Sequence, residues 1–280
     1  MSRLTLDQVR HSMHDLPSLP AVVMELLSSI DQDNVDISVL ARKVSLDQAL
    51  TAKTLRLANS PSFSLQVRVT TIQQAITFLG FQSTRNLITT AALTGSFTDN
   101  RCPGFDNRSF WRHSIATAAC ARVLARRMRL NQDFAFTAGL LHDIGRLVLV
   151  TGFPDRYSAV LEQSRREDRP LLDVEREQLG VDHVAAGAAL ADYWKFSDTM
   201  LHAIAYHHEP EAPGAGLLAP IIHVANAIVH ALDLAGDEYE LVPPVSMVAW
   251  TALGLSQEAL LHVFRETEMQ FEEMSNILVA

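Results

Sequence analysis

The stretch Gly139-Leu-Leu-His-Asp-Ile-Gly-Arg146 is the most informative part of this chain, because it places a His-Asp pair inside a strongly apolar, helical pattern. Core-type side chains flank the pair on both sides: Leu140, Leu141, Ile144, Leu147, Val148 and Leu149. A buried imidazole and a buried carboxylate need partners. We therefore expect His142 and Asp143, carried on one helix, to form the centre of a polar site. The other His-Asp pair, His14-Asp15, lies in a polar segment and is interpreted as a chance copy.

The composition is that of an ordinary globular chain with room for one large core or two small ones. Its 280 residues are 48% hydrophobic and 20% charged. The segment from Met1 to His14 is polar and shows no signal-peptide pattern, and no run of about 18 apolar residues is free of charged or turn residues. The sequence therefore predicts a cytoplasmic protein without a membrane span, in which Cys102 and Cys120 are reduced thiols.

The charge balance argues against a nucleic-acid partner. A formal net charge of −9 repels a phosphate backbone over most of the surface. One basic cluster is present, and its spacing is that of a solvated helix face: Arg122, Arg126, Arg127 and Arg129.

The hydrophobic period is that of a helix almost throughout, and the alternation that strands require is missing. The sequence therefore predicts an all-α fold with short connections. Thr71 is expected to cap a helix that Gly80 ends, and Ser45-Leu-Asp-Gln48 has the form of a capping box for the next helix. Longer helices are expected at about Ser109 to Met128, Arg156 to Glu167, Asp182 to Trp194 and Leu218 to Leu234.

Residues 94–108 mix Gly, Pro, Asn and Asp with little periodicity, which is typical of a boundary. We expect residues 1–95 to form an N-terminal helical part and residues 96–280 to form a helical core with C-terminal helices. One compact domain is the alternative.

Five further residues could meet the His-Asp pair: His113, His183, His207, His208 and Asn226. Each has an ordinary explanation when taken alone, namely helix capping, a charge at a helix end or a satisfied polar group in the core. His223 is expected to be such a core group. Together, imidazole nitrogens and carboxylate oxygens suit Zn, Fe, Mn, Ni or Co better than Ca or Mg alone. The remaining histidines lack supporting context and are assigned to the surface or to packing: His11, His202, His230 and His262.

The order of these residues resembles the successive signatures of the HD superfamily of metal-dependent phosphohydrolases. The matching segments are Trp111-Arg-His-Ser114, Ala138 to Leu147, His183 with Gly187, His207-His-Glu-Pro210 and His223-Val-Ala-Asn226. The N-terminal part resembles the HDOD family, the HD-related output domain of bacterial signalling proteins, through Leu16-Pro-Ser-Leu-Pro20, Asp47 to Ser60, Ile72 to Gly80 and Arg85-Asn-Leu87. The likeness covers roughly residues 10–235 and implies a multi-helix HD-like core with an N-terminal helical subdomain.

The resemblance also implies a site. His113, His142, Asp143, His183, His207 and His208 stand where catalytic relatives ligate one or two metal ions. Asn226 stands where those relatives have an aspartate, and its neutral amide oxygen binds a cation less strongly than a carboxylate does. Arg146 stands where relatives that hydrolyse cyclic dinucleotides usually have a lysine, and we expect it to bind phosphate. The segment Glu211-Ala-Pro-Gly-Ala-Gly216 lacks the Gly-Tyr-Pro signature of cyclic di-GMP phosphodiesterases, which argues against that activity.

Three functional interpretations follow. The favoured one is a bacterial regulatory HDOD module that binds a partner or a small phosphorylated ligand and keeps a degenerate metal site. The alternative is a metal-dependent phosphohydrolase that acts on a phosphate ester or a nucleotide. The third is a metal-free scaffold in which the histidines form a hydrogen-bonded core network. The expected cofactor is a divalent transition metal (Fe, Mn, Ni or Zn). Asn226 and the missing Gly-Tyr-Pro segment favour the regulatory module over an enzyme.

The C-terminal segment, residues 258–280, carries an apolar stripe on a helix rich in Glu. The stripe consists of Leu260, Phe264, Thr267, Phe271, Met274 and Leu278. We expect it to pack onto the core of its own chain, with a homodimer seam as the alternative. If the protein signals, we expect its partner to be a separate signalling protein.

Overall fold

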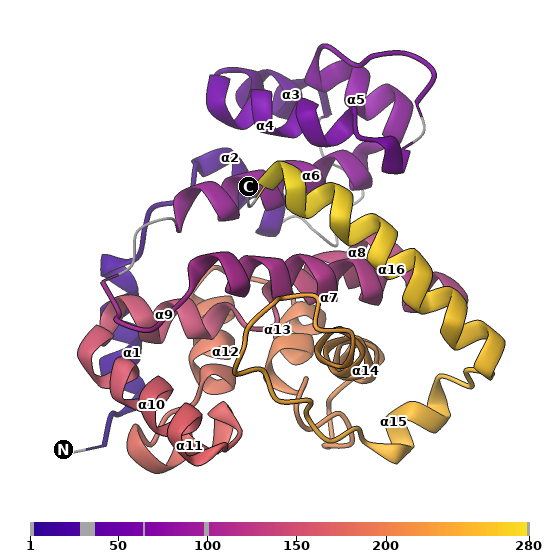
Figure 1. The fold of residues 1–280 in the computed structure, drawn as a ribbon. Helices are drawn as coiled ribbons and strands as arrows, with labels where there is room; N and C mark the ends of the chain where they lie inside the picture. The colour runs from indigo at the N-terminus through magenta and orange to yellow at the C-terminus, as the bar shows by residue number, and fades with distance from the viewer. Residues whose placement is uncertain (1–2, 29–36, 64, 98–100, 279–280) are drawn as a thin grey trace.

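All regular secondary structure in the described part of the chain is helical (Figure 1), which confirms the predicted fold class. The structure is a computed structural model, and it describes residues 3–28, 37–63, 65–97 and 101–278. Toward the N-terminus lie α1 (Leu6–Ser12), η1 (Met13–Asp15), α2 (Ala21–Ser28), α3 (Ile37–Ser45), α4 (Gln48–Ala58), η2 (Pro61–Phe63), α5 (Ile72–Leu79) and α6 (Phe81–Ser96). They are followed by α7 (Asn107–Arg127), α8 (Gln132–Leu141), α9 (Ile144–Gly152), α10 (Pro154–Glu167), α11 (Leu171–Gln178), α12 (His183–Tyr193), α13 (Asp198–Ala205), α14 (Leu218–Ala231), α15 (Met247–Ala252) and α16 (Gln257–Leu278).

Local capping sets the helix ends. The Thr71 side chain accepts a hydrogen bond from the backbone N–H of Gln74, and Gly80, with a φ of +83°, separates α5 from α6, as predicted. The predicted capping box at Ser45 is wrong. Ser45 is the last residue of α3 and donates its hydroxyl to the carbonyl of Ala41, while Asp47 caps α4. An ionised carboxylate directly before the first turn is the stronger acceptor for the free N–H groups there.

The His-Asp pair lies in a turn between two helices, so the prediction of one continuous helix is wrong. Helix α8 ends at Leu141 and α9 begins at Ile144. On a continuous helix, successive side chains point about 100° apart. The turn relaxes that constraint, and the Nε2 atom of His142 lies 3.5 Å from Oδ1 of Asp143.

Helix α7 lies at the centre of the fold, where it packs against α8, α14 and α16 (Figure 1). Its inward face is built from small and apolar side chains that are fully buried, among them Ala116, Ala118, Cys120 and Leu124. Cys102 and Cys120 are both buried, and neither forms a disulfide bond within the described residues. Because α7 also carries His113, the best-packed helix of the fold positions one candidate ligand.

Helices that precede the predicted boundary at residue 95 pack against helices that follow it. Helix α1 packs against α9 and α12, and α16 contacts α4 as well as α7. The buried hydrophobic residues form one cluster that extends from Leu4 to Met274. The division into 1–95 and 96–280 stays a prediction, and residues 98–100 within the proposed boundary lie outside the described residues.

The C-terminal stripe packs onto the core, as expected. Thr267, Phe271 and Met274 are buried, and the Arg112 guanidinium lies 4.8 Å from the centre of the Phe271 ring. Arg112 also donates a hydrogen bond of 3.0 Å to the hydroxyl of Ser275. Leu260, Phe264 and Leu278 are partly buried against the same core. A homodimer seam stays a prediction.

The segment Gln132–Gly152 has the length and composition of a membrane span. In the structure it comprises α8, the turn with the His-Asp pair and α9, and 89% of its most apolar window is buried inside the fold. Its apolar character is therefore explained by burial in the protein core.

Helices α9 and α12 meet so closely at Gly145 that no side chain fits there. A Cβ atom on Gly145 would lie 1.9 Å from the carbonyl oxygen of His183 and 2.4 Å from the backbone nitrogen of Gly187. Because backbone atoms cannot rotate away, we expect Gly145→Ala to lower the free energy of unfolding by about 3 kcal/mol, as measured by urea denaturation. The control is Gly95→Ala, where the nearest atom is the flexible end of Lys53 at 3.1 Å. Equal stability of Gly145→Ala and the unmodified protein would contradict this account of the packing.

Candidate metal centre

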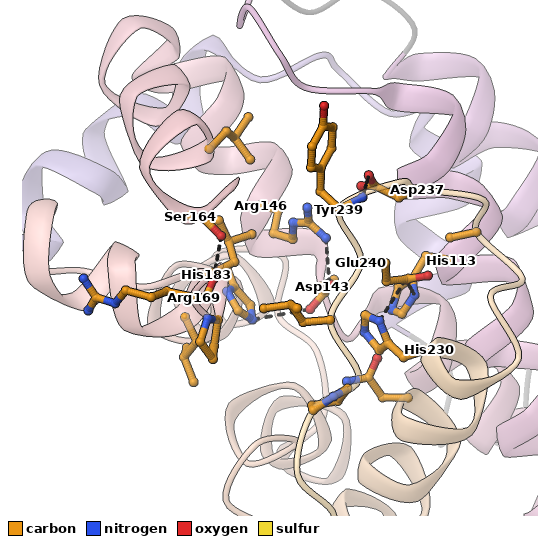
Figure 2. Close-up of a pocket in the computed structure, with 18 of the residues that line it drawn as sticks. His113, Asp143, Arg146, Ser164, Arg169, His183, His230, Asp237, Tyr239 and Glu240 are labelled. Atoms are coloured by element: carbon orange, nitrogen blue, oxygen red, sulfur yellow. Dashed lines mark hydrogen bonds and ion pairs between the residues drawn. The ribbon is translucent and has the colours of Figure 1, made fainter. Parts of the chain in front are cut away.

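Five separate elements bring the predicted site residues to one place. His113 comes from α7, His142 and Asp143 from the turn between α8 and α9, and His183 from the first residue of α12. His207 and His208 follow the end of α13, and Asn226 lies on α14. Figure 2 shows His113, Asp143 and His183 around a common pocket. Apart from His208, which is partly buried, all of these residues are buried.

The first half of the cluster joins His113, His142 and Asp143. The Nε2 atoms of His113 and His142 lie 3.3 Å apart. The Nδ1 atom of His142 donates to the Gly139 carbonyl at 2.7 Å. Since a carbonyl only accepts, the proton of the neutral ring is on Nδ1 and the lone pair is on Nε2. The Nδ1 atom of His113 lies 3.4 Å from a carboxylate oxygen of Glu240.

The second half joins Asp143, His183, His207 and His208. Oδ1 of Asp143 lies 3.4 Å from Nε2 of His183 and 3.4 Å from Nε2 of His207. The Nε2 atoms of His183 and His208 are 3.2 Å apart. His207 donates from Nδ1 to the Ile204 carbonyl at 2.7 Å, and its buried Nε2 has no hydrogen-bond partner among the described residues. This orphaned lone pair also faces the shared carboxylate.

Glu175 stands behind His183 and holds it from two sides. One carboxylate oxygen accepts the backbone N–H of His183 at 2.8 Å and the Nδ1–H at 2.6 Å. The other accepts the Tyr157 hydroxyl at 2.7 Å. Glu175 is fully buried. A carboxylate behind a ligating histidine fixes the tautomer and the orientation of the ring.

The donor set fits one or two transition-metal ions. The ligand atoms of His113, His142 and Asp143 lie within 4.8 Å of one another, and the same holds for Asp143 with His183, His207 and His208. Two nitrogen lone pairs that face each other repel unless a proton or a cation lies between them. Imidazole and carboxylate donors suit Fe, Mn, Ni and Zn. Asp143 belongs to both groups and is the natural bridge between two ions.

Asn226 lines the same cavity as the cluster. It is 4% exposed, and its Oδ1 atom has no hydrogen-bond partner among the described residues. A buried acceptor without a donor is costly. Asn226 as a metal ligand stays a prediction; its amide oxygen would lack the charge of an aspartate.

The pocket holds two of the candidate ligands, His142 and Asp143, in the forms that bind metals. Burial lowers the pKa of His142 to about 3 despite the opposing charge of Asp143. Burial alone would raise the pKa of Asp143, but His142 and His183 hold it well below its usual value. Burial also opposes protonation of His183, but Glu175 and Asp143 together raise its pKa to about 8. The carboxylate is thus ionised and His142 is neutral at neutral pH.

A cavity of about 600 Å³ opens beside the cluster, which is within the usual size for a small-ligand site. Arg146 lines it, with Nη1 3.4 Å from Oδ2 of Asp143 (Figure 2). The guanidinium is 5.8 Å from the ring centres of both Phe105 and Phe110, which hold it in place by cation–π contact. Three further arginines line the cavity: Arg165, Arg169 and Arg176. Acidic side chains line it as well, among them Asp106, Asp168, Asp173 and Asp237, so the wall carries charges of both signs.

The sequence analysis missed three residues that contact the candidate ligands. Glu175 lies on α11, a helix that was not predicted, and the helical spacing of Leu171, Val174 and Gln178 was the available sign. Glu240 lies in an irregular segment that carries no periodic signal. His230, expected to be a surface or packing residue, is partly buried, and its Nδ1 atom lies 2.8 Å from Oε1 of Glu240.

Other histidines behave as expected. The Nδ1 atom of His223 donates to the His207 carbonyl at 2.8 Å, and its Nε2 atom accepts the Ser246 N–H at 2.9 Å, so it is a satisfied core group. His14 lies away from the cluster, where its ring meets Tyr193 edge to face.

Fold and site together define an all-helical, HD-type protein. The chain belongs to the HDOD domain family, whose model matches residues 16–210. Asn226, His230 and Glu240 lie beyond that matched region.

The similar proteins share only part of their length with this chain. An uncharacterized protein of Treponema pallidum is 27% identical over 236 residues, which is 82% of this chain and 45% of that protein. The ribonuclease Y of Mycoplasmoides gallisepticum is 30% identical over 105 residues, which is 38% of this chain and 15% of that enzyme. The chain thus spans less than half the length of these relatives.

Solved structures are similar over nearly the whole chain. An HDOD domain protein of unknown function from Geobacter sulfurreducens has a TM-score of 0.80 at 25% identity, covering 98% of this chain and 96% of that one. A candidate phosphohydrolase from Shewanella amazonensis SB2B has a TM-score of 0.75 at 29% identity, covering 97% and 98%.

Replacing Glu175 by Gln tests its place behind His183. The Gln side chain turns one acceptor into a donor, so the backbone N–H of His183 or the Tyr157 hydroxyl loses its partner. We expect Glu175→Gln to lower the free energy of unfolding of the metal-free protein by about 2 kcal/mol in urea denaturation. The matched control is Glu177→Gln on the same helix, where a half-exposed carboxylate pairs with Arg169. A loss no larger than that of the control would refute the assigned contacts.

Proposed function

We propose that this chain is a regulatory HDOD module that holds one or two divalent transition-metal ions and binds a small phosphorylated ligand beside them. The convergence of three imidazole Nε2 atoms on Asp143 carries the proposal, those of His142, His183 and His207, and the Nε2 atom of His113 lies 3.3 Å from that of His142. Each ring presents its Nδ1 atom to a carbonyl or carboxylate oxygen. Such outer contacts are typical of metal-ligating histidines.

A metal-free core network accounts for these contacts less well. In such a network, one nitrogen of each facing pair donates a proton to the other. Here Nδ1 donates outward in His142 and His207, so their Nε2 atoms are acceptors. The Nε2 atom of His113 faces that of His142, but that of His207 has no hydrogen-bond partner among the described residues. A cation satisfies these lone pairs together, and a bound ion also supplies a Lewis acid that attracts phosphate oxygens.

The phosphate-binding role falls to Arg146. Its side chain is 20% exposed and reaches from the Asp143 carboxylate into the cavity. A guanidinium donates two parallel hydrogen bonds to a phosphate. The likeness to a candidate phosphohydrolase agrees with a phosphorylated ligand.

Hydrolysis of a phosphate ester or nucleotide is the second candidate function. It is favoured by the two ligand groups that share Asp143, since paired ions are a common arrangement for phosphoester cleavage. Asn226 speaks against it, because it removes one negative charge from the donor set. A separate signalling protein as partner, a homodimer through α16 and a cytoplasmic location stay predictions.

Metal uptake tests the proposal directly. We expect protein purified without a histidine tag to bind Mn²⁺, Fe²⁺, Ni²⁺ or Zn²⁺, as measured by elemental analysis and isothermal titration calorimetry. Because Asp143 belongs to both ligand groups, Asp143→Ala should weaken binding by about 100-fold or more. The control is Asp173→Ala, an exposed carboxylate on the wall of the same cavity. Unmodified protein that binds none of these ions would rule out the proposed function.

Restoring the missing carboxylate separates binding from catalysis. We expect Asn226→Asp to tighten metal binding by about tenfold, because it adds a negative charge to the donor set. Phosphomonoesters and phosphodiesters are then screened for turnover with each metal. A regulatory module gives no turnover in the unmodified protein, while turnover that Asp143→Ala abolishes would establish the phosphohydrolase instead.

A further inference from the structure

The segment between α14 and α15, residues 233–246, runs across the cavity beside the His/Asp cluster; we call it the strap. Asp237, Tyr239 and Glu240 line the cavity from this segment (Figure 2). The strap lies beyond residue 210, where the match to the family model ends. It therefore brings side chains to the site from outside the part of the chain that defines the family.

Glu240 is a strap residue that lies close to two histidines. Its side chain is only 10% exposed, and Oε1 lies 3.4 Å from Nδ1 of His113 and 2.8 Å from Nδ1 of His230. The two imidazole rings lie beside each other, with centres 4.6 Å apart. One carboxylate oxygen thus faces two ring nitrogens.

We propose that Glu240 is a positioning residue that keeps the His113 proton on Nδ1 and so turns the Nε2 lone pair toward His142 and Asp143. The inference rests on the proposed metal-binding function. A carboxylate that faces Nδ1 attracts the proton to that nitrogen, because the charged acceptor favours the donor form there. The opposite nitrogen is then free to bind a cation.

The other rings of the cluster show the same arrangement with different acceptors. Glu175 accepts from Nδ1 of His183, and the carbonyls of Gly139 and Ile204 accept from His142 and His207. Those three acceptors are close in sequence to the histidines that they orient. His113 and Glu240 are far apart in sequence, so this ring is oriented only when the strap is in place.

The tautomer of His113 tests the proposal without any metal. Long-range ¹H–¹⁵N correlation spectra of the metal-free protein report which ring nitrogen carries the proton, and His113→Gln assigns the signals. We expect His113 to be protonated on Nδ1 in the unmodified protein and to shift toward the Nε2-protonated form in Glu240→Gln. The control is Glu238→Gln, an exposed carboxylate on the same strap. Unchanged His113 signals in Glu240→Gln would overturn the proposal.

Metal binding provides the second measurement. We expect Glu240→Gln to weaken calorimetric binding of Mn²⁺ or Zn²⁺ by about tenfold, with Glu238→Gln unchanged. If Glu240 served only to anchor the strap, the variant would lower the melting temperature of the metal-free protein and leave both tautomer and affinity as they were. If Glu240→Gln does not fold, Glu240→Asp keeps the charge one methylene further away and should give a smaller shift in the same direction.

The two measurements fail in different ways. Unmodified protein that takes up no metal contradicts the proposed function, while the tautomer shift still decides the role of Glu240 toward His113. If the unmodified protein and Glu240→Gln bind metal equally tightly, the role of Glu240 is contradicted, while the proposed function is not.

Discussion

The site depends on one buried negative charge. Asp143 is 7% exposed, and an unpaired carboxylate at that depth would cost several kcal/mol. Nε2 atoms of three histidines lie 3.4 to 3.5 Å from its Oδ1, and Arg146 lies 3.4 Å from its Oδ2. The break between α8 and α9 turns Asp143 toward these groups, and Gly145 lets α12 come close enough to deliver His183. Helix geometry, close backbone packing and electrostatics thus converge on the same two residues that interrupt the apolar segment.

Orientation of the imidazoles is the second constraint. A histidine has two nitrogens, and it serves as a ligand only if the correct one is free. In this protein an outer acceptor faces each of the four rings around Asp143, and two of the acceptors are carboxylates. The core of the site lies within the HDOD match, while α14 and the strap add Asn226, His230 and Glu240 from beyond it. The C-terminal part of the chain therefore adjusts a site whose framework belongs to the family.

Charge distinguishes the two candidate functions. Each carboxylate in a donor set offsets part of the charge of the ions and strengthens their binding. With Asn226 in place of an acidic residue, Asp143 is the one carboxylate within the two described ligand groups that join it to the histidines of the cluster. Under the proposed function, such a site would still hold a metal ion and a phosphate. Its binding of two neighbouring metal ions, the arrangement that favours hydrolysis, would be weaker. This physical difference supports a regulatory role.

The sequence by itself determined the all-helical fold, because apolar residues recur with the helical period and local caps such as Thr71 end the helices. It also determined the candidate ligands, since a histidine or aspartate in an apolar setting requires a partner. Only the tertiary structure decided how these residues meet. The turn at His142-Asp143 cannot be predicted from the sequence, because the residues on both sides of it are apolar and continue the helical pattern. The partners of Glu175 and Glu240 are not visible in the sequence pattern either, because these contacts are made between separate elements. Short-range periodicity therefore specifies helices and candidate ligands, while packing between distant helices brings the rings together around Asp143.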